Sequence, residues 1–304
     1  MMNSLISVSG LSRRFGAETV LDQIDLEIPA GRVFGLVGEN GAGKTTLIRH
    51  CLGLYRAQSG SVRVFGQDPV ADPAGVLSRI GFLSEDRDLP DWMTVAELMR
   101  FQAPFYPGWD QKLVEELRVH FGLPEKRPVS QLSRGQKAKL GLLVALGHRP
   151  ELLLLDEPSS GLDPLARRDI LEALIRTTIS EGRTVFFSSH LLDEIERVCD
   201  WVGFLVGGRI VLQGSVDEIN ERHRRLIARF DRDQNTLPDI PGSATIAGRG
   251  MEWTLVGQSS VGEIARSLKE MGGKIVDDQV ASLEEVFLAY SRSDFSQRGE
   301  KGRG

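Results

Sequence analysis

The segment Gly38-Glu39-Asn40-Gly41-Ala42-Gly43-Lys44-Thr45 decides the fold, because it matches the phosphate-binding loop pattern in full. An apolar run at residues 33–37 precedes it and predicts a strand, and residues 45–51 after it predict a helix. Glycines let backbone N–H groups turn inward around phosphates, and the helix N-terminus adds positive potential. We therefore predict a nucleotide site rather than a plain glycine-rich turn. The residues expected to contact the nucleotide are Gly38, Asn40, Gly41, Gly43, Lys44, Thr45 and Thr46.

Two side chains of this loop and two later acids predict hydrolytic chemistry. Lys44 is expected to bridge the β- and γ-phosphates, and Thr45 to offer its hydroxyl to Mg²⁺. The segment Leu152-Leu153-Leu154-Leu155-Asp156-Glu157 is an apolar strand that ends in two carboxylates. Asp156, at the carboxyl end of the strand, is expected to hold the Mg²⁺ shell, and Glu157 to act as general base on water. A helix cap is the alternative for such acids, and the phosphate loop earlier in the chain disfavours it.

Three further segments carry a resemblance to a known family. Leu132-Ser133-Arg134-Gly135-Gln136 resembles the LSGGQ signature of ABC ATPases, with Arg134 where glycine is commonest. Ser160-Gly161-Leu162-Asp163 resembles the D-loop of that family, and His190 after two serines resembles its switch histidine. The segments follow the family's order over about the first 215 residues. The chain is therefore identified as a member of the ABC transporter ATP-binding subunits.

The resemblance implies a role for each of these positions. Two subunits would pair head to tail, so that each ATP lies between the phosphate loop of one chain and the signature of the other. Ser133 and Gly135 would donate to the γ-phosphate in trans, and His190 would contact the γ-phosphate and hold the geometry of the attacking water. Phe15 matches the position where the family stacks an aromatic ring on adenine; a core phenylalanine is the alternative. The other nucleotide-contacting residues that the resemblance implies are Gln136 and Asp163.

One position departs from the family pattern. The family usually places glutamine after the strand that matches Ile80-Gly81-Phe82-Leu83, where it senses Mg²⁺ and the attacking water. Here the matching residue is Glu85, which can ligate Mg²⁺ through oxygen but cannot donate through an amide. Glutamate at this position resembles a subset of the family that often serves export. Residues 281–288 resemble the C-terminal segment of drug- and polysaccharide-exporter ATPases.

The remaining pattern predicts an α/β fold, and the resemblance implies that its core is a P-loop NTPase of the ABC ATPase type. Apolar strands alternate with helices, which favours a mainly parallel sheet. We expect the ATPase domain at residues 1–215, with a proline-punctuated helical insert at about residues 86–148. A small α+β accessory unit is expected at residues 216–290, with a helix-compatible basic run at residues 222–232. The polar tail at residues 291–304 is expected to be disordered.

Composition excludes several classes of protein. The net charge of −5 and the pI near 5.7 give no electrostatic footprint for nucleic acid. No stretch approaches the roughly 18 apolar residues of a membrane span, so we expect a cytoplasmic chain that contacts the membrane only through a permease. Cys51 and Cys199 match no metal spacing and are expected to be reduced. The histidines that match no motif are interpreted as structural: His50, His120, His148 and His223.

The sequence favours a transport ATPase that uses ATP and Mg²⁺, over two alternatives. Members of the family that act on DNA carry long coiled-coil insertions, and no sustained heptads occur here. Members that act in translation carry two cassettes on one chain, and only one phosphate loop occurs here. A module that binds ATP without hydrolysis is disfavoured by Glu157 and His190. The expected partners are a separate integral-membrane permease and a second ATPase subunit, either a second copy or a relative. Export is favoured by Glu85 and residues 281–288, while the sequence does not specify the cargo.

Overall fold

The computed structural model describes residues 4–179, 182–238, 240–258 and 261–291. Most of the tail expected to be disordered, residues 291–304, therefore lies outside the described residues. The chain forms two compact units, Met1–Ile210 and Val211–Gly304, and each is considered by itself. Cys51 and Cys199 are free cysteines, as expected. In the part of the chain that the structure describes, no helix has the length and apolar character needed to cross a membrane.

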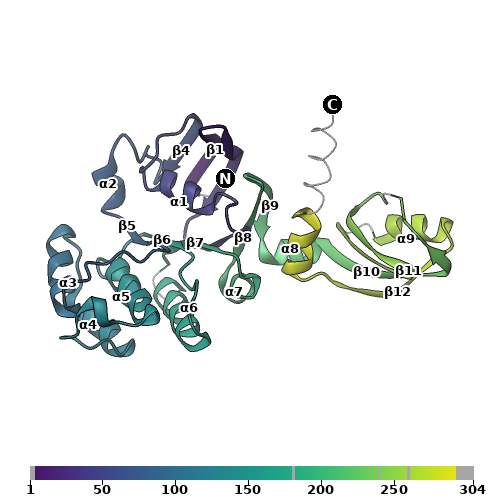
Figure 1. Cartoon of the computed structure of the whole chain (residues 1–304). Helices are drawn as coiled ribbons and strands as arrows, with labels where there is room; N and C mark the ends of the chain where they lie inside the picture. The colour runs from purple at the N-terminus through teal and green to yellow at the C-terminus, as the bar shows by residue number, and fades with distance from the viewer. Residues whose placement is uncertain (1–3, 180–181, 239, 259–260, 292–304) are drawn as a thin grey trace. The chain divides into compact units, whose positions relative to one another are not determined.

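A six-stranded sheet forms the centre of the first unit (Figure 1), with strand order β5-β6-β7-β3-β8-β9. The pairs β5·β6, β6·β7, β7·β3 and β3·β8 are parallel. Every residue of β3, β6 and β7 is buried, as expected for parallel strands that are covered on both faces. The bounds are β3 (Val33–Val37), β5 (Ile80–Leu83), β6 (Leu152–Asp156), β7 (Thr184–Ser189), β8 (Trp201–Val206) and β9 (Arg209–Ser215). The predicted α/β class is confirmed.

A second, antiparallel sheet of the first unit has the order β2-β1-β4. Its strands are β1 (Ser4–Phe15), β2 (Glu18–Pro29) and β4 (Ser59–Val64). One apolar cluster joins this sheet to the first helix and to the central sheet, through Ile6, Leu26, Leu47 and Leu154 among others. The phosphate loop is therefore anchored at both ends in the same core. The helices that follow central strands are α1 (Lys44–Cys51), α6 (Pro164–Ile179) and α7 (Leu192–Val198), while α2 (Pro73–Leu77) lies between β4 and β5.

The chain between β5 and β6 is largely helical, and this segment is called the insert. Its elements are α3 (Val95–Gln102), η1 (Ala103–Phe105), α4 (Gln111–His120), η2 (Val129–Gln131) and α5 (Arg134–Leu146). Each α-helix begins at a side chain that accepts a backbone N–H bond of the first turn: Thr94 for α3, Asp110 for α4 and Ser133 for α5. The helix starts of the insert are therefore fixed locally by sequence.

The second unit contains an antiparallel sheet of order β11-β10-β12. Its elements are α8 (Val216–Arg222), β10 (His223–Gln234), β11 (Ser243–Gln258), α9 (Val261–Glu270) and β12 (Gly273–Val280), followed by a helix at residues 283–291. The helix-compatible reading of residues 222–232 was wrong, because most of that run is β10. Leu226, Ala228 and Phe230 are buried at alternate positions, so a period of two outweighs the helix propensity of the arginines between them.

Candidate functional site

The phosphate loop connects the end of β3 to the start of α1, and its glycines are required by the backbone. Gly43 caps α1 with φ 108°, and Gly41 has φ 83°, a region that side-chain-bearing residues rarely adopt. A Cβ on Gly43 would lie 2.8 Å from Leu21 Cδ2, and one on Gly38 would lie 2.5 Å from Leu205 O. The predicted loop is therefore held against its neighbours in a shape that only glycine permits.

Lys44 lies inside this loop with 5% of its surface exposed. Its Nζ donates to the carbonyl oxygens of Gly38, at 2.6 Å, and Glu39, at 3.2 Å. The same nitrogen lies 3.0 Å from Glu157 Oε1. The ammonium group of Lys44 is thus surrounded by oxygen atoms. A bound phosphate would offer it oxygen partners of the same kind.

The two acids after β6 are fixed by the neighbouring strand. Asp156 pairs with Ser188 in the parallel register of β6 and β7. The Ser188 hydroxyl donates to Asp156 Oδ1 at 2.7 Å and accepts from the backbone N–H of Glu157 at 3.0 Å. Sequence reasoning missed Ser188, because its role depends on which strand lies beside β6. The serine pair before His190 was the one available signal.

Glu157 is the centre of the hydrolytic group. It is buried, and its Oε2 lies 2.7 Å from His190 Nδ1 while Oε1 faces Lys44. Its φ of 46° places a non-glycine residue in the left-handed region, a strain that persists only where surrounding contacts enforce it. A carboxylate held between a cation and an imidazole can accept a proton from a water molecule beside it.

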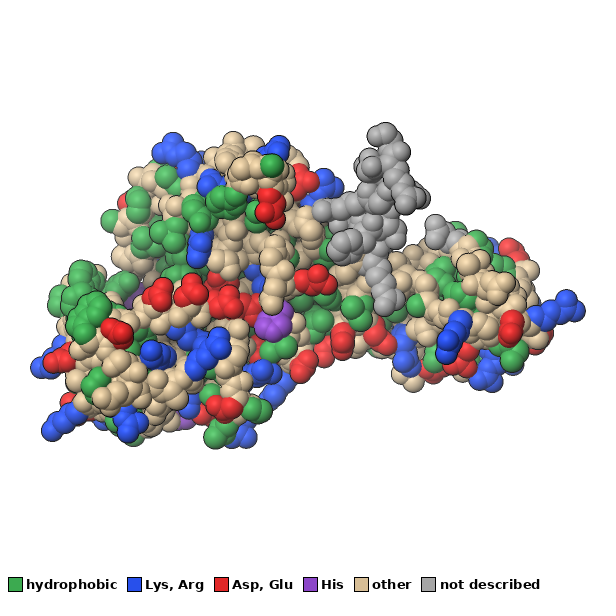
Figure 2. Space-filling model, in the orientation of Figure 1, with side chains coloured by type: hydrophobic (Ala, Val, Ile, Leu, Met, Phe, Trp, Pro, Cys, Tyr) green, Lys and Arg blue, Asp and Glu red, His purple; other side chains and the backbone are tan. Residues whose placement is uncertain are grey.

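A cavity of about 360 Å³ adjoins these acids and is lined by Thr45, Glu85 and Asp156 among others. Hydroxyl and carboxylate oxygens are the ligands that Mg²⁺ prefers, and the ion usually keeps water and phosphate as further ligands. Among the described residues, no group of three or more His, Cys, Asp or Glu side chains is arranged to hold a metal ion without further ligands. Figure 2 shows acidic side chains in a band across this face of the first unit, between the antiparallel sheet and the insert. The residues present therefore fit Mg²⁺.

The signature segment makes contacts elsewhere in the chain. Ser133 Oγ accepts from Gln136 N at 3.2 Å, and Gln136 Oε1 accepts from Ser133 N at 3.0 Å, which together cap α5. Gly135 lies against α6, since a Cβ there would be 3.1 Å from Ala166 Cβ. Asp163 accepts from Ala166 N at 3.0 Å, and such backbone bonds hold the pKa of its carboxyl below the usual range. Among the described residues, no hydrogen bond or ion pair joins the signature to the phosphate loop.

Phe15 lies at the end of β1 with 41% of its surface exposed, so it is not a core residue. Its ring meets Tyr55 edge-on at 5.7 Å between centroids. The Arg13 guanidinium lies 4.6 Å from the Phe15 centroid and 4.8 Å from that of Tyr55. Tyr55 also lines the cavity of Thr45. Adenine stacking on Phe15 stays a prediction, with an available ring and a tyrosine that sequence reasoning did not single out.

The histidines outside the motifs make structural contacts where the structure gives them partners. His50 Nδ1 lies 2.8 Å from Thr46 O, and His223 Nδ1 lies 2.7 Å from Ile219 O. His148 stacks on Tyr106 with centroids 4.0 Å apart. His148 Nε2 also lies 3.2 Å from the carbonyl oxygen of Ile80.

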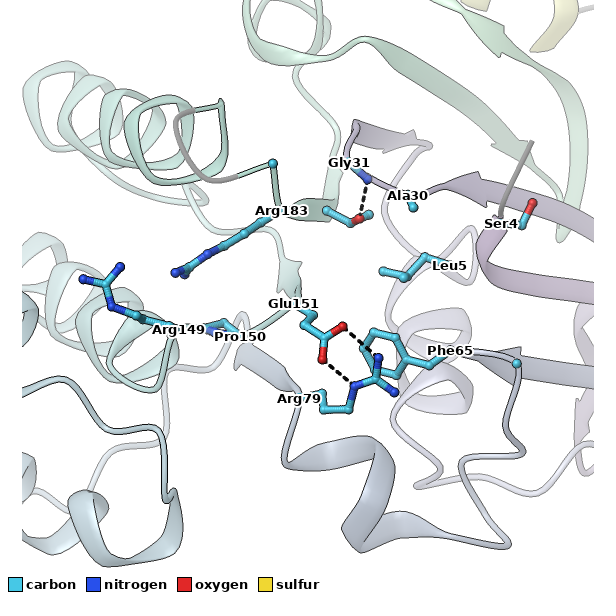
Figure 3. Close-up of a pocket in the computed structure, with 13 residues that line it drawn as sticks. Ser4, Leu5, Ala30, Gly31, Phe65, Arg79, Arg149, Pro150, Glu151 and Arg183 are labelled. Atoms are coloured by element: carbon cyan, nitrogen blue, oxygen red, sulfur yellow. Dashed lines mark hydrogen bonds and ion pairs between the residues drawn. The ribbon is translucent and has the colours of Figure 1, made fainter. Parts of the chain in front are cut away.

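A pocket of about 690 Å³ lies at the opposite edge of the central sheet, where the parallel strands begin (Figure 3). Glu151 and Thr184, at the starts of β6 and β7, line it. Arg79 donates to both carboxylate oxygens of Glu151, at 2.6 and 2.7 Å, and lies over the Phe65 ring. These two charges satisfy each other. Open α/β sheets bind ligands at the carboxyl ends of their strands, which favours the smaller cavity beside Asp156 as the site.

Comparison with known proteins agrees with this geometry. The family model described as "ABC transporter" matches residues 21–160. The ABC transporter ATP-binding protein YtrB of Bacillus subtilis is 30% identical, over 94% of this chain and 97% of its own length. The bacitracin transport ATP-binding protein BcrA of Enterococcus faecalis is 36% identical, over 74% of each chain.

A solved structure agrees in fold as well. The structure of an ATP-binding subunit of an ABC transporter is 30% identical, with a TM-score of 0.65, and covers 72% of this chain and 92% of its own. The family-model match at residues 21–160 includes the phosphate loop and the acids after β6. The chain belongs to the ABC transporter family, as one of its ATP-binding subunits and an ATPase.

Proposed function

We propose that this chain hydrolyses MgATP at the loop of Lys44, with Glu157 as general base, and thereby powers a separate membrane permease. The observation that carries the proposal is the position of the Glu157 carboxylate, 3.0 Å from Lys44 Nζ and 2.7 Å from His190 Nδ1. Asp156, its neighbour on the strand, lines the cavity that fits Mg²⁺. Binding and hydrolytic groups thus meet at one edge of the sheet.

The residues divide the work of the reaction between them. Lys44 binds oxygens of the β- and γ-phosphates, and the loop amides hold the remaining phosphate oxygens. Thr45 and Asp156 would hold Mg²⁺, with Glu85 at the same cavity, and the ion would neutralise part of the phosphate charge. Glu157 takes a proton from the attacking water as the oxygen bonds to the γ-phosphorus. ADP leaves with the electron pair of the broken P–O bond.

We also propose that ATP joins two subunits head to tail. The signature, residues 132–136, lies against α6 at Gly135. In the described part of the chain it has no hydrogen bond or ion pair to its own phosphate loop, so it is available to the nucleotide of a partner. Light scattering on the Glu157→Gln variant tests this, because slow hydrolysis would preserve the assembled form. We expect a doubled mass in MgATP and a single mass in MgADP. A single mass in both, at an ATP concentration that saturates the site, would exclude a homodimer and leave pairing with a related ATPase.

We propose the helical insert as the surface that contacts the permease. Trp92 is 77% exposed, and Phe101 and Phe105 are exposed with ring centroids 5.3 Å apart. Figure 2 shows hydrophobic side chains gathered over α3. Tyr106 and Trp109 serve the fold instead, since Tyr106 stacks on His148 and Trp109 fills the space beside Gly147. Exposed aromatic side chains suit the capture of an amphipathic helix.

A pull-down of the permease tests the insert as a docking surface. Polar substitutions at Trp92 and Met93 should lose the permease while basal ATP hydrolysis continues, because neither residue lies among the hydrolytic groups. Val119→Ser is a matched control, since Val119 is an exposed apolar residue of α4 in the same insert. Crosslinks to the permease that fall in the second unit, and spare residues 86–121, would contradict this docking surface.

The direction of transport and the location of the chain complete the proposal. We propose export, on the strength of Glu85 and of the resemblance of residues 281–288 to exporter ATPases. Relatives that take part in bacitracin transport support a role in moving such compounds. We place the chain on the cytoplasmic face of the membrane, bound to its permease, because its nucleotide is supplied there. In inside-out vesicles that contain the permease and this chain, external ATP should drive uptake of the cargo, and ATP-driven loss of cargo from preloaded vesicles would contradict export.

A further inference from the structure

Arg87, two residues after Glu85, is a buried arginine directed at the loop that follows Glu157. It is 6% exposed, and its Nη2 donates to Ser160 O at 2.8 Å and to Pro158 O at 3.2 Å. Its backbone φ is 52°, so both Arg87 and Glu157 occupy the left-handed region. Two strained residues joined through one loop indicate that the contacts between them are enforced by the fold.

The same loop is bounded by Arg134, the residue that stands where the family signature commonly has glycine. Gly161 has φ 64°, and a Cβ added there would overlap the Arg134 guanidinium. Burial is the largest cause of the lowered pKa of Arg87, and the positive charge of Arg134 acts in the same direction. This agrees with two guanidinium groups near one loop. Glu85 also reaches this loop, since its Oε1 accepts from Ser160 Oγ at 3.4 Å.

We propose that Arg87 and Arg134 form a clamp on residues 158–161 that positions the Glu157 carboxylate for hydrolysis. Pro158 follows Glu157 directly, so a bond to its carbonyl oxygen fixes the backbone on the C-terminal side of the base. The guanidinium of Arg134 lies beside Gly161, at the far end of the same loop. Glu85 and Asp156 line the same cavity, and Arg87 follows Glu85 by two residues. The clamp therefore links that cavity to the position of the Glu157 carboxylate. The inference rests on the proposed role of Glu157.

Both arginines are positioning residues, since each lies beside residues 158–161 and would act on Glu157 through that loop. Their effect should therefore appear in turnover rather than in ATP binding. Arg87→Ala should lower kcat by roughly tenfold, as for the loss of one charged hydrogen bond, and leave KM for ATP within about twofold. Arg87→Lys keeps a cationic donor and should recover most of the loss. Arg79→Ala removes an arginine from the opposite edge of the sheet, and should leave kcat unchanged.

The decisive experiment combines Arg87→Ala with Glu157→Gln in a double-mutant cycle of single-turnover hydrolysis. If Arg87 acts through Glu157, its removal should slow the parent and have little further effect in the Glu157→Gln background. A folded Arg87→Ala protein with parental kcat, or equal fold-losses in both backgrounds, would overturn the clamp. Parental hydrolysis by Glu157→Gln alone would instead remove the proposed base, so the two failures are distinguishable.

The Arg134 half of the clamp is tested by a second cycle with Gly161→Ala. Alanine at Gly161 is strained by its backbone in any background, but it overlaps Arg134 only when the arginine is present. We therefore expect Gly161→Ala to reduce kcat more in the parent than in Arg134→Gly. Additive losses would show that Arg134 does not restrain the loop and would overturn its part in the clamp.

Discussion

Nδ1 of His190 lies 2.7 Å from Oε2 of Glu157, although the two residues are 33 positions apart in the chain. The parallel pairing of β6 and β7 produces this contact, because it brings the loops after both strands to one edge of the sheet. With Nδ1 directed at the carboxylate, Nε2 is left to face a bound phosphate. The histidine can therefore hold the base and contact the nucleotide with different nitrogens.

Removal of the Lys44 ammonium should weaken ATP binding. Lys44→Ala eliminates the buried charge that is held by Gly38 O and Glu39 O. We expect ATP affinity to fall by roughly ten- to a hundredfold, since a hydrogen bond to a charged group contributes about 1.5–3 kcal/mol. Titration calorimetry measures the affinity, and circular dichroism checks the fold. Parental affinity and turnover in a well-folded Lys44→Ala protein would remove Lys44 from the site.

Changes at Glu85 should alter the dependence on Mg²⁺. Glu85→Gln keeps an oxygen ligand, so binding should persist and turnover should change modestly, in either direction. Glu85→Ala removes the oxygen from the cavity of Thr45 and Asp156, so a higher Mg²⁺ concentration should be needed for half-maximal turnover. A Mg²⁺ titration of ATP hydrolysis distinguishes the variants. If both match the parent at every concentration, Glu85 has no part in the metal shell.

Acid should destabilise the first unit partly through His148. Burial lowers the pKa of His148 to about 4, and the charge of Arg183 acts in the same direction, while the hydrogen bond between His148 Nε2 and the acceptor Ile80 O opposes them. The unfolded chain, with a histidine pKa near 6.5, binds the proton more readily. Stability from this group is therefore complete above about pH 6.5 and falls as the pH drops toward 4, by about 2 kcal/mol between pH 7 and pH 5.

His148→Phe keeps a ring beside Tyr106 but cannot take up a proton. Calorimetry at pH 7 and pH 5 should show a smaller loss of Tm for the variant than for the parent. His120→Phe, at an exposed position on α4, is the matched control and should keep the parental loss. Equal losses in His148→Phe and the parent would show that this buried imidazole does not contribute.

The sequence could predict those parts of the site whose residues are neighbours in the chain. The phosphate loop, the acids after β6 and the start of α5 at Ser133 each depend on neighbours within a few residues. Side-chain type and spacing therefore specify them. The alternation of apolar strands with helices likewise predicted the α/β class, because burial on both faces leaves a continuous apolar run.

What sequence could not predict depends on contacts between distant segments. Ser188 meets Asp156 only because β6 and β7 are neighbours, and Arg87 meets Pro158 only because two loops end at one edge of the sheet. The strand β10 was missed since arginines at its partly exposed positions resemble a helix surface. Two of these arginines, Arg224 and Arg225, instead pair with carboxylates of β12, a partner that sequence alone did not reveal.

Hydrolysis by the Glu157→Gln variant is the measurement that tests the site most directly. The substitution keeps the size of the side chain and removes the carboxylate that accepts the proton. Single-turnover hydrolysis of radiolabelled MgATP should slow by roughly a hundredfold or more, as for loss of a general base, while ATP affinity is kept. Glu151→Gln, the same change at the opposite edge of the sheet, should hydrolyse at the parental rate. A folded Glu157→Gln protein that hydrolyses bound ATP as fast as the parent would contradict Glu157 as the base.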